Sequence, residues 1–196
     1  NGKLIVTGDL QVDGKITAAS QDQYGSVFLH WGSKNCPSGA VKLYDGAGFS
    51  GHYGHPGPGA GLCVKGGDPG PGTGYEGDLL YPMHTSGSSA TPPGIGADRS
   101  LFCSMCQWPK GFCFEQWGGH TCPTGFTAAV QGYGMGAHYT HNGPAGAHYC
   151  IDPVGFDNSV GSTGNGHLYN MRMQGNGGYG GAWPTGTVVK CATSCR

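Results

Sequence analysis

The sequence predicts an all-β fold that is irregular, rich in glycine and stapled by disulfides, in which two tandem repeats of one small fold follow a short β-ladder. Three observations support this prediction. The chain of 196 residues contains 41 glycines and almost no window that could hold a helix of three turns. Its nine cysteines are typical of secreted, disulfide-stapled domains. The phrase WGSKNCPSG at Trp31 recurs as WGGHTCPTG at Trp117.

The expected strands come from short apolar runs bounded by Gly, Pro or Asn. The runs are SVFLHW, AVKLY, GHLYNMRM and GTVVKC. Each indicates a short strand that ends in a tight turn. Residues 97–108 form the longest stretch without Gly or Pro, and we expect a short helix there, around DRSLFCSMC.

The repeat extends well beyond its opening phrase. HYGH at residues 52–55 returns as HYTH at residues 138–141, and a Gly-Pro step and a cysteine follow in both copies. We therefore predict a first cysteine-rich repeat at residues 26–107 and a second at residues 112–196, each with four cysteines in the same order.

Four cysteines allow three pairings in each repeat. A bond within CSMC would close a small, strained loop, so we expect the first two cysteines of a repeat to pair with its last two, in an order that the sequence leaves open. Zinc is the rival interpretation of this CxxC, but the second copy breaks the spacing. The disulfide candidates are Cys36, Cys63, Cys103, Cys106, Cys122, Cys150, Cys191 and Cys195.

Cys113 stands outside the repeated set, because its counterpart in the first copy is Val27. We expect it to be unpaired within the chain, either as a buried free thiol or as a bridge to another molecule.

Residues 1–20 form the predicted β-ladder, with Gly recurring between short alternating apolar stretches. Such a ladder is too small to bury its own apolar face, so we expect it to pack against another subunit as an assembly segment. It resembles stretches of trimeric phage tail fibres and adhesins. The candidate assembly residues are Leu4, Val6, Leu10, Val12 and Ile16.

Histidine offers the main candidate for metal chemistry. The pairs His52/His55 and His138/His141 are equivalent in the two repeats. The main interpretation is that these side chains hydrogen-bond to their Gly-rich loops. The alternative is a zinc, copper or nickel site formed where the two pairs meet.

A polar segment, HTSGSSATPP, is the kind of sequence that carries O-linked sugars outside cells. The candidate O-glycosylation sites are Thr85, Ser86, Ser88, Ser89 and Thr91.

The pattern W-G-x-x-x-C-P-x-G, followed by G-H-Y-x-H-x-G and a further cysteine, resembles the tandem cysteine-rich, non-collagenous domain of sponge-type short-chain collagens and related secreted invertebrate proteins. The resemblance covers residues 26–196. It implies an extracellular role in structure or matrix. The chain departs from those collagens because the β-ladder stands where a Gly-X-Y region would precede the domain.

Composition narrows the function classes. Charged residues make up 11% and the net charge is −1, so the chain has no basic surface for nucleic acid. No apolar run is long enough to span a membrane. No repeated carboxylate pair or nucleophile motif indicates catalysis, and no cofactor is expected. We read the chain, which begins at Asn1, as a mature secreted protein. We expect a non-catalytic extracellular protein that associates with itself into a fibre or matrix. The alternative is a secreted carbohydrate-binding or adhesin module with glycan partners.

Overall fold

The computed structural model describes residues 25–55, 60–67, 79–87, 91–141, 147–156, 166–174 and 184–196. These residues form ten strands and no helix, which confirms the all-β prediction. No helix in this part of the chain is long and apolar enough to cross a membrane. The predicted β-ladder and two glycosylation candidates, Ser88 and Ser89, lie outside the described residues.

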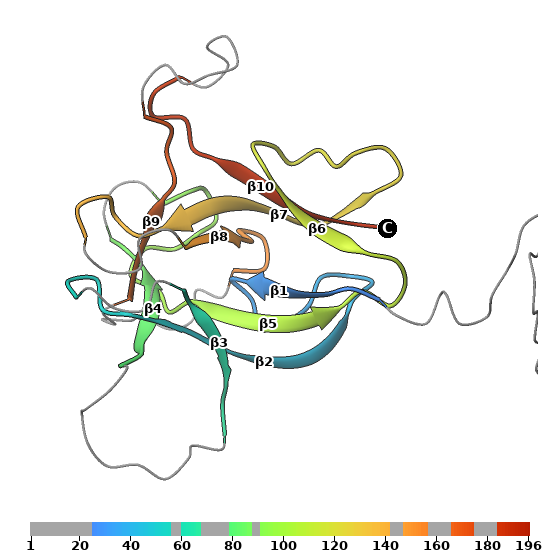
Figure 1. The fold of residues 1–196 in the computed structure, drawn as a ribbon, viewed down its shortest axis with the longest axis horizontal. Helices are drawn as coiled ribbons and strands as arrows, with labels where there is room; N and C mark the ends of the chain where they lie inside the picture. The colour runs from blue at the N-terminus through green and yellow to red at the C-terminus, as the bar shows by residue number, and fades with distance from the viewer. Residues whose placement is uncertain are drawn as a thin grey trace, which may run out of the picture.

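Five strands come from the first half of the chain, and Figure 1 colours them from blue to yellow-green. They are β1 (Val27–Trp31), β2 (Val41–Ser50), β3 (Leu62–Lys65), β4 (Tyr81–Thr85) and β5 (Phe102–Gln107). β5 lies between β1 and β2 and runs antiparallel to both. β2 also pairs with β3 and β4.

The second half supplies the other five strands. They are β6 (Cys113–Trp117), β7 (Thr127–Gly136), β8 (His148–Ile151), β9 (Gly166–Asn170) and β10 (Lys190–Cys195). β10 lies between β6 and β7, and β7 also pairs with β8 and β9. The pairing scheme of the first half therefore occurs again, with each strand replaced by the one five places later.

The registers agree as well as the order. Trp31 pairs with Cys103 in the first half, and Trp117 pairs with Cys191 in the second. Both long strands skip one residue against their central partner, β2 at Leu43 and β7 at Ala129. A β-bulge of this kind bends the strand and increases its twist. The two halves thus bend at equivalent positions.

The expected helix around DRSLFCSMC is wrong, because this segment contains the central strand β5. Its backbone pairs with β1 on one side and β2 on the other. Two of its cysteines are fully buried and form disulfides to neighbouring loops and strands. These long-range constraints outweigh the local absence of Gly and Pro.

The halves join through two short parallel contacts. Trp31 of β1 pairs with Ile151 of β8, and residues 83–85 of β4 pair with residues 166–168 of β9. Figure 1 shows β1 and β8 side by side at the middle of the molecule. The pairings therefore close a circuit that runs β7-β8-β1-β5-β2-β4-β9 and back to β7.

The halves also share one hydrophobic core. Large buried side chains from both sides belong to a single cluster, so neither half encloses its core alone. The cluster contains Trp31, Met83, Ile95, Leu101 and Cys103 from the first half, and Met135, Tyr149, Ile151, Phe156 and Leu168 from the second.

Candidate functional site: a histidine cluster between the halves and an open groove

The first half contains both of its expected disulfides, and the structure settles their order. Cys36 bonds Cys106, and Cys63 bonds Cys103. The Cα atoms lie 5.7 Å and 5.8 Å apart, within the range that disulfides require. Each bond ties a loop or edge strand to the central strand β5.

The second half departs from the expected pairing. Cys150 bonds Cys191, as the prediction allowed, but Cys195 bonds Cys113 and Cys122 is free. The prediction that Cys113 is unpaired and Cys122 bonded is therefore wrong.

Strand register explains this exchange. CATSC is one residue longer than CSMC, so Ser194 rather than Cys195 occupies the position of Cys106. Cys195 instead lies directly opposite Cys113 in the β6–β10 ladder. The Ser194 hydroxyl hydrogen-bonds to the Cys122 sulfur, at the place where the first half has its disulfide. The extra cysteine and the extra residue together were the sequence signal for this change.

The two predicted histidine pairs meet in one cluster between the halves. Within each pair the imidazoles are neighbours, with ring centroids 4.2 Å apart for His52 and His55 and 5.1 Å apart for His138 and His141. Tyr53 joins the pairs, because its ring lies 4.9 Å from that of His141. Each pair also closes its own turn, since His55 and His141 donate backbone hydrogen bonds to the carbonyls of the first histidine in the pair.

Two further histidines that sequence reasoning missed complete this histidine cluster. His167 of β9 stacks on Tyr53 at 4.4 Å and lies 4.4 Å from His84 of β4. His84 and His167 are directly opposite in the parallel β4–β9 pairing, which only the tertiary structure reveals. Six of the nine histidines therefore gather where the halves meet. They are His52, His55, His84, His138, His141 and His167.

Burial and mutual repulsion favour the neutral form of four of these imidazoles. Desolvation lowers the pKa of His52, His84, His141 and His167 below 6.5. For His167, neighbouring histidines lower the pKa further, and Asp98 offsets part of the effect. These four rings are thus uncharged near neutral pH, and acid would charge them.

The cluster does not offer a ready-made metal site. Within the described residues, no three His, Cys, Asp or Glu side chains are placed to hold a metal ion together. His52 and His55 stack face to face, whereas a shared metal requires ring nitrogens to converge on one point.

A second polar link crosses between the halves. His30, which is 3% exposed, hydrogen-bonds through Nε2 to the Asp152 carboxylate at 2.9 Å. Burial alone would raise the pKa of Asp152, but hydrogen bonds from His30 and from the backbone of Val154 and Gly155 hold it below its usual value.

The glycosylation candidates differ in access. Thr85 is fully buried, and its hydroxyl donates to the Gly96 carbonyl and accepts from Arg99 N, so it is not available for O-glycosylation. Ser86 and Thr91 are partly exposed.

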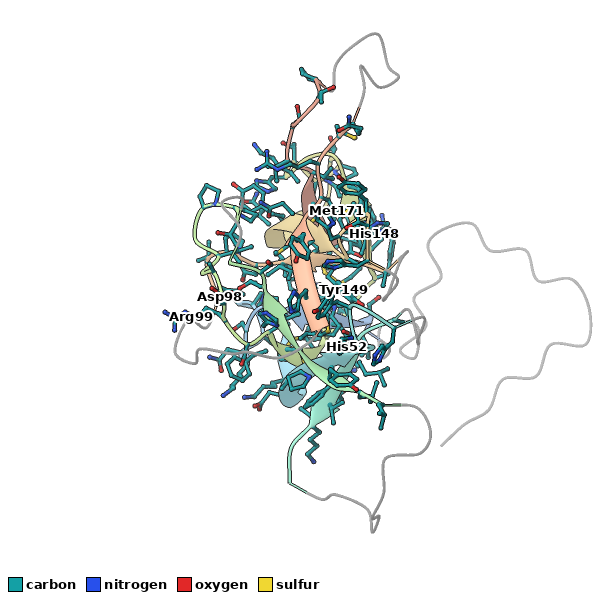
Figure 2. All side chains as sticks on the ribbon, turned by 90° about the vertical axis from the view of Figure 1, so that its left-hand side faces the viewer. His52, Asp98, Arg99, His148, Tyr149 and Met171 are labelled. Carbon is teal, nitrogen blue, oxygen red and sulfur yellow. A yellow bond between two sulfur atoms is a disulfide. The ribbon has the colours of Figure 1, made fainter. Side chains whose placement is uncertain are left out.

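An open groove of about 1290 Å³ crosses the second half. The residues that line it include Trp117, His148, Tyr169, Met171, Arg172 and Val189. In Figure 2, His148 and Met171 lie in the upper half of the molecule, where both line the groove, and Tyr149 lies below them. Trp117 is 40% exposed here, which is unusual for so large an apolar side chain.

A strip of exposed apolar residues runs along the first half. It comprises Leu62 and Val64 of β3 and Leu79 and Leu80 just before β4, and each of these side chains is 39% exposed or more. The strip flanks β2, because β3 and β4 both pair with that strand, and exposed apolar side chains gathered on one half are typical of an interaction surface.

Comparison with known proteins yields no matching family model and no matching curated protein.

Proposed function

We propose that this chain is an extracellular structural protein that associates with itself into a fibre or matrix and has no catalytic role. Four disulfides support an extracellular location, because such bonds persist in oxidising surroundings. The resemblance to short-chain collagen domains points in the same direction. The N-terminal segment with Leu4 and Leu10 is proposed as one further contact between subunits.

The observation that carries the proposal is the pair of uncovered apolar surfaces. The strip along Leu62 and Val64 and the groove around Trp117 lie on different halves. Low charge leaves little electrostatic repulsion to keep such surfaces apart. A protein with two apolar surfaces and few charges is suited to regular self-association.

Sedimentation velocity and negative-stain microscopy of the oxidised full chain test this proposal. We expect species larger than the 20.1 kDa monomer that grow with protein concentration. A chain that sediments as a monomer from micromolar to millimolar concentration would contradict it.

The groove favours carbohydrate binding as a second candidate function. Trp117 and Tyr169 provide aromatic surface for sugar rings, and Asn170 and Arg172 provide polar groups beside them. A glycan array with the wild type and a Trp117→Ala variant tests this function. Saturable binding that the variant loses would support it, and no binding to any glycan would exclude it.

A further inference from the structure

The second half covers one face of the first half within the chain. Trp31 packs edge-on against Tyr149, with ring centroids 5.2 Å apart. Asp152 N donates to the Trp31 carbonyl at 3.0 Å, next to the Trp31–Ile151 pairing. Below them, Leu168 and Met83 lie in the same buried cluster. This internal contact is well packed, because Trp31 retains only 7% of its exposure.

The second half has a face equivalent to this one, but no residue in the described part of the chain covers it. Strand register equates Trp117 with Trp31 and Met171 with Met83. The parallel extends to backbone approach, since Gly48 lies against the Trp31 and Met83 side chains and Gly134 lies against those of Trp117 and Met171. In the first half this face is filled by the second half. In the second half it is the open groove.

The first half likewise has an equivalent of the covering face, and no described residue covers this face either. Register equates the buried residues Tyr149, Ile151 and Leu168 with Leu62, Val64 and Leu80. Tyr149, Ile151 and Leu168 are at most 6% exposed, whereas their three counterparts are 39–51% exposed. The apolar strip is therefore the counterpart of the surface that fills the first half's groove.

Strand edges show the same imbalance. β1 pairs with β5 and β8, but its counterpart β6 pairs, among the described residues, only with β10. β8 pairs with β7 and β1, but its counterpart β3 pairs there only with β2. In the part of the chain that the structure describes, each half thus has one edge without a partner, and the two edges correspond to strands that pair inside the chain.

From these correspondences we infer that the groove of one molecule receives the apolar strip of a second copy, in the arrangement that already joins the two halves. β3 of the incoming copy pairs with β6, and Val64 takes the place opposite Trp117 that Ile151 takes opposite Trp31. The inference rests on the proposed self-association and names its contact.

The side chains that differ between the two contacts change in compensating ways. Inside the chain the Tyr149 hydroxyl lies against Gly61, where a Cβ atom would come within 2.8 Å of it. In the proposed contact the smaller Leu62 replaces the tyrosine, and His148 replaces the glycine. The positions equivalent to the buried pair His30 and Asp152 are Gln116 and Lys65. In the proposed contact the Gln116 amide oxygen accepts a hydrogen bond from the Lys65 ammonium group.

A contact of this kind is heterologous, because strip and groove are different surfaces of the same chain. Each molecule keeps a free strip at one end and a free groove at the other. Repetition gives a filament, or a ring if the rotation closes.

Three variants of the full, oxidised chain test the inference. The strip variant carries Leu62→Asp and Val64→Asp, and the groove variant carries Trp117→Asp, with Trp117→Ala as its replacement should the aspartate prevent folding. The matched control is Leu43→Asp, since Leu43 on β2 is 50% exposed and Leu62 is 51% exposed. Circular dichroism and disulfide mapping establish that each variant folds.

In sedimentation velocity, we expect the control to assemble like the wild type and each interface variant to associate more than about tenfold more weakly. Mixing the strip and groove variants in equal amounts should restore pairwise association, because the intact groove of the strip variant can receive the intact strip of the groove variant. The inference is wrong if the folded interface variants assemble as strongly as the wild type, or if their mixture stays monomeric. Either result would refute this contact but not the proposed self-association. A monomeric wild type would instead refute the proposed function itself.

Discussion

Ser194 and Cys122 show how one inserted residue redistributes the disulfides of the second half. Ser194 occupies the position that Cys106 holds in the first half, and it contacts the free Cys122. The bond that is absent there is replaced by the one between Cys113 and Cys195 at the end of the same ladder. The number of covalent links to the central strand of each half is thereby kept at two.

The substitution Ser194→Cys should create a fifth disulfide, to Cys122. The equivalent bond in the first half joins Cα atoms 5.7 Å apart, which shows that this position accommodates a disulfide. Closing a long loop should raise the stability by about 2–4 kcal/mol, because the unfolded chain loses entropy. Mass mapping of non-reduced peptides and urea unfolding measure both effects.

The wild type provides the control for that experiment. Alkylation of the native oxidised protein should label Cys122 and no other cysteine, and Ser194→Cys should abolish the label. Retention of the label in the variant, or labelling of Cys113 in the wild type, would show that the pairing described above is incorrect.

At the scale of strands, Gly48 and Gly134 are equivalent positions with unequal surroundings. A Cβ atom at Gly48 would come within 3.2 Å of the Met83 and Trp31 side chains. At Gly134 it would approach Met171 and Trp117 even more closely, at 2.8 and 3.0 Å. Yet Trp31 is enclosed in the shared core, whereas Trp117 borders the open groove and has space to move.

Gly48→Val should therefore destabilise the monomer more than Gly134→Val, despite the shorter contacts at Gly134. Overpacking a closed core costs about 1–3 kcal/mol, and a partner that can shift into solvent relieves most of that cost. Urea unfolding at low protein concentration measures the difference. Equal losses would mean that Trp117 is held as rigidly as Trp31.

The sequence predicted the strands that have a local pattern of apolar and turn residues. It did not predict strands that are specified by pairing with distant neighbours. SVFLHW contains β1 and GHLYNMRM contains β9, and both runs are bounded by turn residues. CSMC lacks any such local signal, because its strand is specified by neighbours on both sides. The sequence suggested a meeting of the two histidine pairs only as part of the metal alternative, and His84 and His167 join the pairs through a parallel pairing between distant strands.

For the whole molecule, the shared core makes the halves interdependent. Trp31 and Met83 are covered by Tyr149 and Leu168 from the other half, so separation would expose large apolar surfaces on both. Residues 26–107 and 112–196 produced separately should each lack cooperative thermal unfolding, and mixing them should restore it. Calorimetry checks this, and a sharp transition in either isolated half would show that it folds independently.

The histidine cluster should make the folded protein sensitive to mild acid. Around His167 lie His52, His84 and His141, with Asp98 as the opposing charge. Because burial and these neighbours lower the folded-state pKa of His167 below the ordinary 6.5, the unfolded chain binds more protons at and just below that pH. The contribution of the neutral histidines to stability is therefore fully present above about pH 6.5. It is lost as the pH falls toward their lowered folded-state pKa values.

His167→Phe should reduce that decline, because phenylalanine retains the stacking on Tyr53 and cannot be protonated. The measurement is the urea midpoint at about pH 7.5 and about pH 5.5, a range that lies above the titration of Asp152, whose pKa is lowered. His120→Gln is the control, because His120 bonds the Gly132 carbonyl away from the cluster. We expect the control to lose as much stability as the wild type on acidification and His167→Phe to lose less. An undiminished loss in His167→Phe would place the acid sensitivity outside the junction of the two halves.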